Sequence, residues 1–349
     1  MTVSAEPRAE TALFAPQSPR RLVDLVFRIR EFGIVAGLAI LVAVTASMQS
    51  RFLSTQELKF ILQDTAIFAL LALGETMVVV TRNVDLSVGS VLGLSAFLSA
   101  DLFGHVHGIP IPIVFLVGLG IGLACGVFNG AVSAIGRVPS LVVTLATLYI
   151  IRGIDILIVG GGQVVASSLP NSFLLIPLES VGGVPYLAIV IAAVVAAGAY
   201  YLRSYRSGRE LYAIGSNPDA ARLAGIPIAK RVFTAFVVSG GIAGVSGVLY
   251  ASRYGTIDST AGTGYELQVI AAVVVGGVAI FGGSGSAIGA ALGALLLNTI
   301  ISALYVLGVS PFWDEALTGL LLIGAIALDR GIQVRLAAAL RKRRSRLGA

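Results

Sequence analysis

The stretch from Arg203 to Arg231 reads RSYRSGRELYAIGSNPDAARLAGIPIAKR and is a polar interval between two apolar blocks. Within it, Asn217 is a good N-cap residue and Pro218 suits the first position of a helix. Asp219 then places a carboxylate in the first turn, where the helix dipole favours negative charge. We therefore expect a short helix to begin at about residue 217, between the two apolar blocks.

The same stretch specifies where this helix ends. Gly225 fits the left-handed position that follows a helix, and Pro227 prevents continuation. A helix of about two turns is marginal in water on its own, so its apolar side chains need a surface to rest on. These side chains are Ala220, Ala221, Leu223 and Ala224. We expect that surface on another protein; the alternative is a well-capped helix in a loop.

The composition is that of an integral membrane protein. Of 349 residues, 56% are hydrophobic, 12% are charged and 42 are glycine, which is more apolar surface than a soluble domain of this size can bury. Apolar runs of about 20 residues, long enough to cross a bilayer core, recur along the chain and predict helices rather than a barrel. The single cysteine, Cys125, lies inside such a run and excludes a disulfide framework.

The expected fold is an all-α, polytopic membrane helical bundle of about ten transmembrane helices. The predicted spans are 32–49, 58–80, 86–103, 110–133, 138–159, 184–202, 231–251, 265–281, 285–307 and 314–329. Residues 1–30 are predicted to be a disordered cytoplasmic tail and residues 331–349 a basic cytoplasmic tail. The transmembrane domain then covers residues 31–330, with the polar segment 203–231 on its inner side.

The orientation follows from the excess of Lys and Arg on the cytoplasmic side of membrane proteins. With the N-terminus inside, the inner segments hold many basic residues: Arg20, Arg21, Arg28, Arg30, Arg82, Arg137, the six of 203–231 and the arginines and lysine of the C-terminal tail. The outer segments hold only Arg51, Lys59 and Arg253, while Arg152 is ambiguous near a helix end. An even number of spans places both termini in the cytoplasm. The net charge of +6 is thus a topology signal and a contact to lipid headgroups, with no need for nucleic acid.

Glycines recur at intervals of four residues in several spans. Gly118, Gly122 and Gly126 form one such stripe, and Gly240 and Gly244 repeat it. Small residues at this spacing let helix backbones approach closely inside lipid. We therefore expect packing faces at these positions.

Polar residues inside the predicted spans are candidates for a solute path, because such groups are costly at membrane depth and usually face a cavity or a partner. Asp85 and Ser87 at the junction of the second and third spans are the most concentrated signal, with capping of the next helix as the alternative role. Hydroxyls and amides suit a neutral, hydroxyl-rich solute, since they exchange hydrogen bonds with it. The predicted path residues are Asp85, Ser87, Ser90, Asn129, Thr144, Thr147, Glu266 and Asn298.

Several classes of enzyme are excluded by what the sequence lacks. A phosphate-binding loop needs Gly-Lys followed by Ser or Thr, and none of the three lysines, Lys59, Lys230 and Lys342, follows a glycine. Neither a zinc-protease motif nor a nucleophile elbow is present. His105 and His107 form an H-x-H pair without a third ligand. We expect a transport protein with no catalytic site, cofactor or metal.

Several separated motifs between about residues 50 and 330 resemble those of bacterial ABC importer permeases for monosaccharides, the ribose, xylose, rhamnose and autoinducer-2 group. The segment 83–90, NVDLSVGS, is similar to the I-D-L-S-V-G-S signature of that family, and 137–147, RVPSLVVTLAT, to its central block. The segment 215–226, GSNPDAARLAGI, resembles its coupling segment, and 264–272, GYELQVIAA, a further motif. Asn83, Leu141 and Ala146 depart from the usual family residues.

This resemblance implies a permease subunit in the cell (inner) membrane. The implied partners are separate ABC ATPase subunits, a second permease that is identical or paralogous, an extracytoplasmic solute-binding protein and membrane lipid. It implies that the short inner helix docks on the ATPase. The residues of this coupling segment are Gly215, Asn217, Asp219, Ala220, Ala221, Arg222 and Gly225. The motifs before Asp85 and before the last span are similar to the autoinducer-2 and rhamnose branch.

Two other classes of transporter stay open at this point. A secondary transporter driven by protons or sodium would use Asp64, Glu75 and Asp85 as relay groups. A passive facilitator would conduct solute without an energy source. The capped inner helix is unexplained by both.

Overall fold

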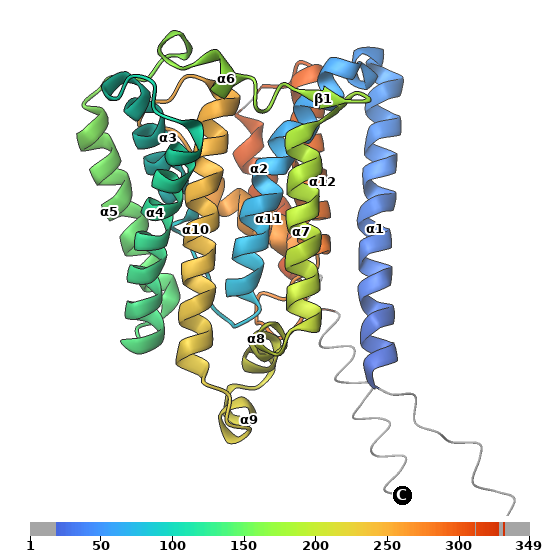
Figure 1. Ribbon diagram of the computed structural model, residues 1–349. Coiled ribbons are helices and arrows are strands. Elements are labelled where there is room, and N and C mark those ends of the chain that lie inside the picture. The colour runs from blue at the N-terminus through green and yellow to red at the C-terminus, as the bar shows by residue number, and fades with distance from the viewer. Residues whose placement is uncertain (1–18, 311, 328–330, 332–349) are drawn as a thin grey trace, which may run out of the picture.

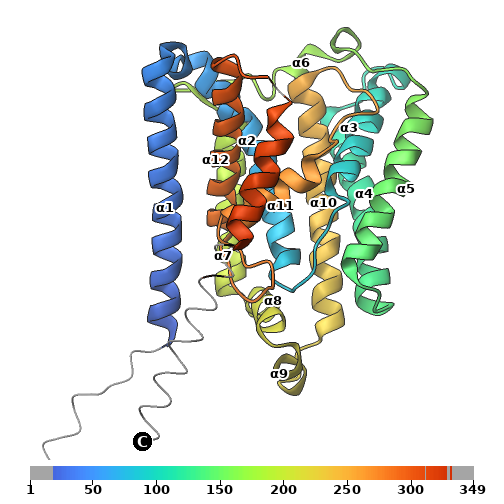
Figure 2. The same cartoon turned by 180° about the vertical axis from the view of Figure 1, so that it is seen from behind.

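The computed structural model describes residues 19–310, 312–327 and 331, and it is almost entirely helical (Figures 1 and 2). The long helices are α1 Pro19–Met48, α2 Thr55–Val79, α3 Val88–His105, α4 Ile111–Gly130, α5 Ser140–Val159, α7 Tyr186–Ser204, α10 Ile228–Tyr254, α11 Tyr265–Val275 and α12 Ala287–Val306. The short elements are η1 Ser50–Leu53, η2 Ala131–Ile135, η3 Ala166–Ser168, α6 Asn171–Leu174, β1 Ser180–Val181, β2 Val184–Pro185, α8 Arg206–Ser216 and α9 Pro218–Leu223. A last helix covers residues 313–327.

Seven of the helices in the described part of the chain are long and apolar enough to cross a membrane: α2, α3, α4 with η2, α5, α7, α10 and α12. The apolar part of α1, Phe32–Met48, and α11 are shorter. Each of the ten predicted spans corresponds to a helix, which confirms the helical bundle. The eighth prediction, 265–281, is too long, because α11 ends at Val275 before Gly276 and Gly277.

The centre of the bundle is built from α2, α3 and α10, which are the most buried spans. The glycine stripes lie where α4 packs against α10. A Cβ atom on Gly122 would overlap the carbonyl oxygen of Gly240, and one on Gly244 would overlap that of Gly118. The two backbones are therefore in direct contact, as the four-residue spacing predicted.

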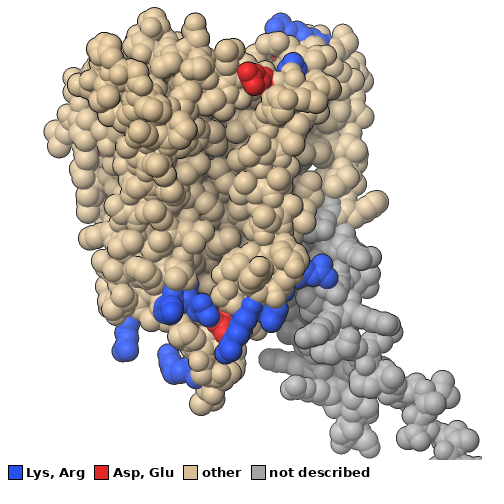
Figure 3. Space-filling model, in the orientation of Figure 1, with Lys and Arg blue, Asp and Glu red and all other residues tan. Residues whose placement is uncertain are grey.

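Positive charge gathers at one end of the molecule. Figure 3 shows Lys and Arg around the end from which α8 and α9 project, with few at the opposite end. The start of α1 lies at that same end in Figure 1. This asymmetry agrees with the predicted orientation, in which α8 and α9 face the cytoplasm.

The outer end is covered by the segment between α5 and α7, which holds α6 and the antiparallel pair β1 and β2 (Figure 1). Ser252 on α10 donates a hydrogen bond to the Phe173 carbonyl at 2.5 Å, and Gln63 on α2 donates to the Pro177 carbonyl at 2.6 Å. Phe173 is fully buried. The long outer loop is thus a packed cover over the spans.

Two expectations near the N-terminus and the inner face need correction. Residues 19–30, predicted as part of a disordered tail, form the first turns of α1; Pro19 suits a first helical position, and no glycine interrupts the chain before Gly33. The polar interval holds two helices rather than one, since α8 precedes α9. The predicted tails at 1–18 and 332–349 lie outside the described residues.

Candidate functional site

A buried polar cluster lies where α3 begins. The chain leaves α2, turns, and runs as an extended segment into the bundle before α3 starts at Val88 (Figure 2). The Asp85 backbone N–H donates to the Glu75 carboxylate at 3.1 Å, and the Ser87 hydroxyl donates to the Asp85 carboxylate at 2.6 Å. The Asn129 amide on α4 donates to the Ser87 hydroxyl at 2.8 Å. All four side chains are buried, so the structure brings three predicted path residues and Glu75 into one network.

Helix α5 forms hydrogen bonds to the extended segment between α2 and α3. The Val84 backbone N–H donates to the Ser140 hydroxyl at 3.3 Å. The Thr144 hydroxyl is shared between the Ser140 carbonyl of its own helix at 2.9 Å and the Val84 carbonyl at 3.2 Å. Thr147 donates to the Thr144 carbonyl one turn earlier. Thr144 and Thr147 therefore lie on the face of α5 that meets the segment, as candidates for a shared path.

A second non-helical segment, 255–264, reaches α3 from the outer end and ends in a series of turns. It follows α10 and leads to α11, which begins at Tyr265. A Cβ atom on Gly89 would overlap the Glu266 carboxylate and lie 2.6 Å from the Gly262 carbonyl oxygen. The first turns of α3 and α11 therefore touch. Helices that start at membrane depth, where two interrupted segments meet, are a common way to build a transport site.

Arg152 on α5 fixes this second segment. Its guanidinium donates to the Ala261 carbonyl at 2.6 Å and to the Ser259 carbonyl at 3.2 Å, and it lies 3.7 Å from the Asp155 carboxylate. Arg152, whose side of the membrane the sequence left ambiguous, is therefore a partly buried structural partner. It joins α5 to the segment before α11.

Three acceptor atoms around the start of α3 have no hydrogen-bond partner among the described residues. They are Glu75 Oε2, Asn129 Oδ1 and Glu266 Oε2. A cavity of about 290 Å³ between α4 and α5 is lined by Asn129 and Thr147, together with apolar side chains. Buried acceptors without a partner are costly, so this region has spare hydrogen-bonding capacity for a ligand or water.

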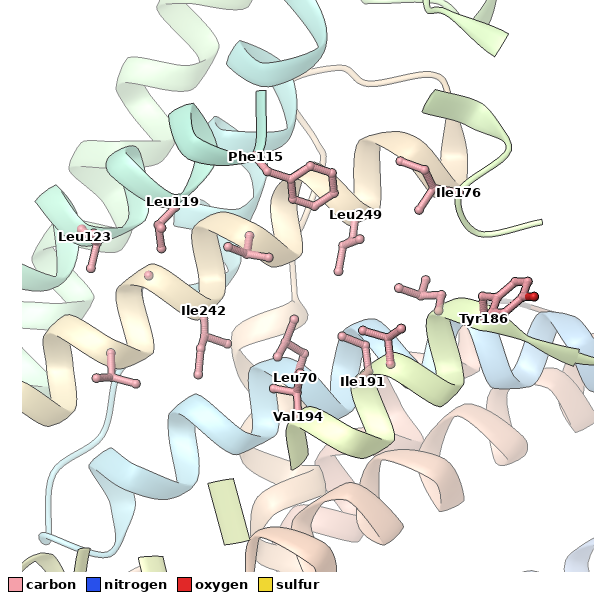
Figure 4. A pocket seen from close by; sticks show the side chains of 15 residues that line it. Leu70, Phe115, Leu119, Leu123, Ile176, Tyr186, Ile191, Val194, Ile242 and Leu249 are labelled. Atoms are coloured by element: carbon pink, nitrogen blue, oxygen red, sulfur yellow. The ribbon is translucent and has the colours of Figure 1, made fainter. Parts of the chain in front are cut away.

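A second hollow has different chemistry. It measures about 620 Å³ and lies between α2, α4, α7 and α10, lined by side chains such as Leu70, Phe115, Ile191 and Leu249 (Figure 4). Tyr186 at its edge carries the one polar side chain in this lining. Such a surface offers a hydroxyl-rich solute almost no hydrogen bonds, and the polar cluster at α3 is the better candidate.

Two predicted positions lie apart from the cluster. Asn298 on α12 donates to the Ala294 carbonyl of its own helix at 2.9 Å, and its place on a path stays a prediction. Asp64 pairs with Arg253 at 3.1 Å near the outer end of α2. Asp64 and Glu75 are eleven positions apart on α2, a rise of about 16 Å, so Asp64, Glu75 and Asp85 do not form one contiguous relay.

The predicted inner helix is present as α9. The Asn217 side chain accepts hydrogen bonds from the Asp219 and Ala220 backbone N–H groups at 3.1 and 3.0 Å. Gly225 has a φ of +76°, as expected for the residue after a helix. Ala221 is buried against this chain, whereas Leu223 is 91% exposed. Only part of the predicted apolar face is therefore available to a partner.

Helix α8, which sequence reasoning missed, anchors α9 to the bundle. The Arg82 guanidinium donates to the last carbonyls of α8, to Gly215 at 2.5 Å and to Ser216 at 2.8 Å. The Tyr212 hydroxyl donates to the Gly285 carbonyl at 3.1 Å, before α12 begins. Leu211 and Ile214, spaced three residues apart and both buried, were the signal for an amphipathic helix here.

Glu210 on α8 adds an ionic contact to α10. Its carboxylate accepts from Arg206 at 2.8 Å and from Arg231 at 2.5 Å. Burial raises the pKa of Glu210, but hydrogen bonds from Arg206 and Arg231, together with their charges, outweigh it and leave the pKa below its ordinary value. The carboxylate is therefore ionised at neutral pH and ties α8 to the start of α10.

Comparison with known protein families identifies this architecture. Residues 58–326 match the family described as branched-chain amino acid transport system, permease component. The chain belongs to this permease family. The match covers every span from α2 to the helix at 313–327, including the polar cluster and the α8–α9 unit.

Individual relatives of this permease are autoinducer-2 import system permease proteins LsrC. The protein from Enterobacter sp. (strain 638) is 35% identical over 300 residues, 86% of each chain. The protein from Salmonella typhi is 34% identical over 316 residues, 90% of each chain. That from Escherichia coli O9:H4 (strain HS) is 34% identical over 316 residues, 90% of this chain and 91% of its own. No solved structure matches the permease.

Proposed function

We propose that this permease is the membrane subunit of an ATP-binding cassette importer for a small, hydroxyl-rich solute. The observation that carries the proposal is α9, a capped helix on the cytoplasmic side that presents Leu223 with 91% of its surface exposed. So short a helix is stable only when it is packed, and its free face is suited to a cytoplasmic ATPase. Closure of two ATPase subunits on ATP would then move the α8–α9 unit.

Autoinducer-2 is the first solute we propose, with rhamnose next and ribose or xylose as further candidates. The names of the relatives support autoinducer-2. The chemistry around α3 supports a neutral polyol, because the hydroxyls of Ser87, Thr144 and Thr147 and the amide of Asn129 exchange hydrogen bonds with hydroxyl groups. A second permease and an extracytoplasmic binding protein complete the proposed importer.

Photo-crosslinking tests the docking of the ATPase. A photoreactive residue replaces Leu223 in the purified permease, which is mixed with the purified ATPase subunit that is encoded with it. We expect a covalent product of the two chains from position 223. The matched control is Leu178, also exposed but in the outer cover, from which we expect none. No product at position 223, or equal products at both positions, would overturn the proposal.

Uptake competition tests the solute. Vesicles that contain the complete importer receive labelled autoinducer-2, rhamnose or leucine, each challenged with an excess of the unlabelled three. We expect autoinducer-2 or rhamnose to enter and leucine neither to enter nor to compete. Entry of leucine alone would contradict a sugar-type solute and favour the amino-acid branch that the family description names.

A further inference from the structure

We propose that Arg82 is a positioning residue that transmits movement of the α8–α9 unit to the extended segment in front of α3. This inference rests on the proposed function, in which an ATPase moves that unit. Arg82 lies at the turn after α2, three residues before Asp85 of the polar cluster. It is therefore the point at which the inner helices and the intramembrane segment meet.

The first step is the contact between Arg82 and α8. Its Nε and Nη2 atoms donate to the Gly215 and Ser216 carbonyls, which are the last two of the helix. The final carbonyls of a helix have no partner within it, and a cation is favourable there. The Arg82 side chain thus caps α8 from a segment more than 130 positions earlier in the chain.

Backbone contacts also hold the Arg82 turn against the end of α8. Arg82 has a φ of +68°, a left-handed conformation that is unfavourable for a residue with a side chain. The Gly283 backbone N–H donates to the Val80 carbonyl at 2.9 Å. Gly215 packs so closely on this turn that a Cβ atom would overlap the Val80 carbonyl oxygen. The turn, the end of α8 and the loop before α12 are therefore in direct contact.

The third step leads from the turn to the cluster. Asn83 is held at the turn by hydrogen bonds from its amide to the Thr81 carbonyl at 3.1 Å and the Thr81 hydroxyl at 2.9 Å. Val84 is held by Ser140 and Thr144 of α5, and Asp85 by Glu75. Only Asn83 and Val84 lie between Arg82 and Asp85, so a shift of Arg82 acts on Asp85 through a very short stretch of chain. A displacement of α8 therefore reaches the hydrogen bonds around α3.

A purely structural cap is the alternative role, and it predicts a different outcome. A cap alone would lower the stability of α8 without changing how much solute is carried per ATP hydrolysed. A transmitting contact would change that ratio while the complex still assembles and hydrolyses ATP. The ratio of uptake to hydrolysis therefore separates the two roles.

The test uses the complete importer in vesicles and measures ATP hydrolysis and solute uptake on the same sample. We expect Arg82→Gln to lower uptake per ATP about fivefold or more, and Arg82→Lys, which keeps the charge but loses the forked geometry, to lie between Arg82→Gln and the natural protein. The matched control is Arg137→Gln. Arg137 also has a left-handed φ, +59°, and is exposed at the same end, and its side chain makes no hydrogen bond to any residue that the structure describes. We expect its ratio to stay within about twofold of the natural value.

An assembled Arg82→Gln importer with the natural ratio would overturn the inference. If Arg82→Gln does not assemble, Arg82→Lys decides: a lowered ratio supports transmission, and an unchanged ratio makes Arg82 a structural cap and overturns the inference. If the natural importer took up solute without ATP, the proposed function itself would be wrong, because uptake would not be coupled to ATP hydrolysis at all. The two failures are therefore distinguishable.

Discussion

The Asn129 amide on α4 donates a hydrogen bond to the Ser87 hydroxyl at 2.8 Å, across 42 positions of the chain. This bond joins a membrane-spanning helix to the extended segment that leads into α3. It leaves Asn129 Oδ1 without a partner among the described residues, beside the cavity between α4 and α5. The pair therefore combines a structural contact with a buried acceptor that lies beside this cavity and has no partner among the described residues.

Replacement of Asn129 by leucine tests this dual role. Leucine removes the donor to Ser87 and the free acceptor, so we expect uptake to fall about tenfold or more, and the free energy of unfolding to fall by about 1–3 kcal/mol. Vesicle uptake and thermal unfolding in detergent measure the two effects. Phe128→Leu is the control, because Phe128 lines the same cavity but is largely exposed. Normal uptake by Asn129→Leu would remove Asn129 from the path.

The contact between α4 and α10 predicts a strong asymmetry between two glycines of one helix. A side chain on Gly122 would meet the α10 backbone, whereas Gly120 has no atom within 4 Å of an added Cβ. We expect Gly122→Leu to lower the free energy of unfolding by about 2 kcal/mol or more, or to prevent folding, and Gly120→Leu to have little effect. Size-exclusion profiles and unfolding midpoints in detergent report both. Equal behaviour of the two variants would contradict this packing.

Glu210 predicts a pH-dependent contribution to stability. Its pKa in the folded state lies below the ordinary value of 4.5, so the folded protein binds this proton more weakly than the unfolded chain does. The contribution is therefore present above about pH 4.5 and is lost as the pH falls through the lower folded-state pKa. We expect Glu210→Gln to cost about 1 kcal/mol at pH 7, with the difference from the natural protein shrinking in acid.

Chemical unfolding of the detergent-solubilised permease at a series of pH values measures this difference. Arg222→Gln is the control, since Arg222 pairs with Asp219 at 3.5 Å and both side chains are largely exposed, so this pair should contribute much less. A difference for Glu210→Gln that is unchanged down to pH 3 would show that the ion pairs with Arg206 and Arg231 do not stabilise the fold.

We expect the exposed Leu223 side chain to contribute to the affinity of the permease for its ATPase. Leu223→Asp places a charge in the proposed interface but disturbs no contact within the chain, because the leucine is exposed. We expect the affinity for the purified ATPase to fall about fivefold or more, with unfolding unchanged. Leu178→Asp on the outer cover should leave the affinity as it is. Binding to the permease in lipid nanodiscs measures this, and an unaltered affinity for Leu223→Asp would place the docking surface elsewhere.

Local patterns in the sequence predicted the spans and α9 well. Apolar runs set the spans, and Asn217, Pro218 and Gly225 act as the caps that their residue types indicate. Helix α8 was not predicted from the sequence because its charged residues, together with Gly208 and Gly215, are typical of a loop. The spacing of Leu211 and Ile214 was the available signal.

The sequence predicted which residues belong to the polar cluster, but not how they are arranged. Asp85, Ser87 and Asn129 were chosen because polar groups are costly in lipid, and the structure shows that they touch. Their geometry, the contact of Gly89 with Glu266 and the bonds from Arg82 to α8 depend on segments far apart in sequence. No periodicity encodes such contacts, so they became visible only in the folded chain.

The most direct test of the account is solute uptake into vesicles that hold the permease alone, or the permease with its ATPase and an external binding protein. We predict that solute accumulates above its outside concentration only when ATPase, binding protein and ATP are all present, and that Arg82→Gln weakens this accumulation while hydrolysis continues. Accumulation by the permease alone, driven by an ion gradient, would contradict the account.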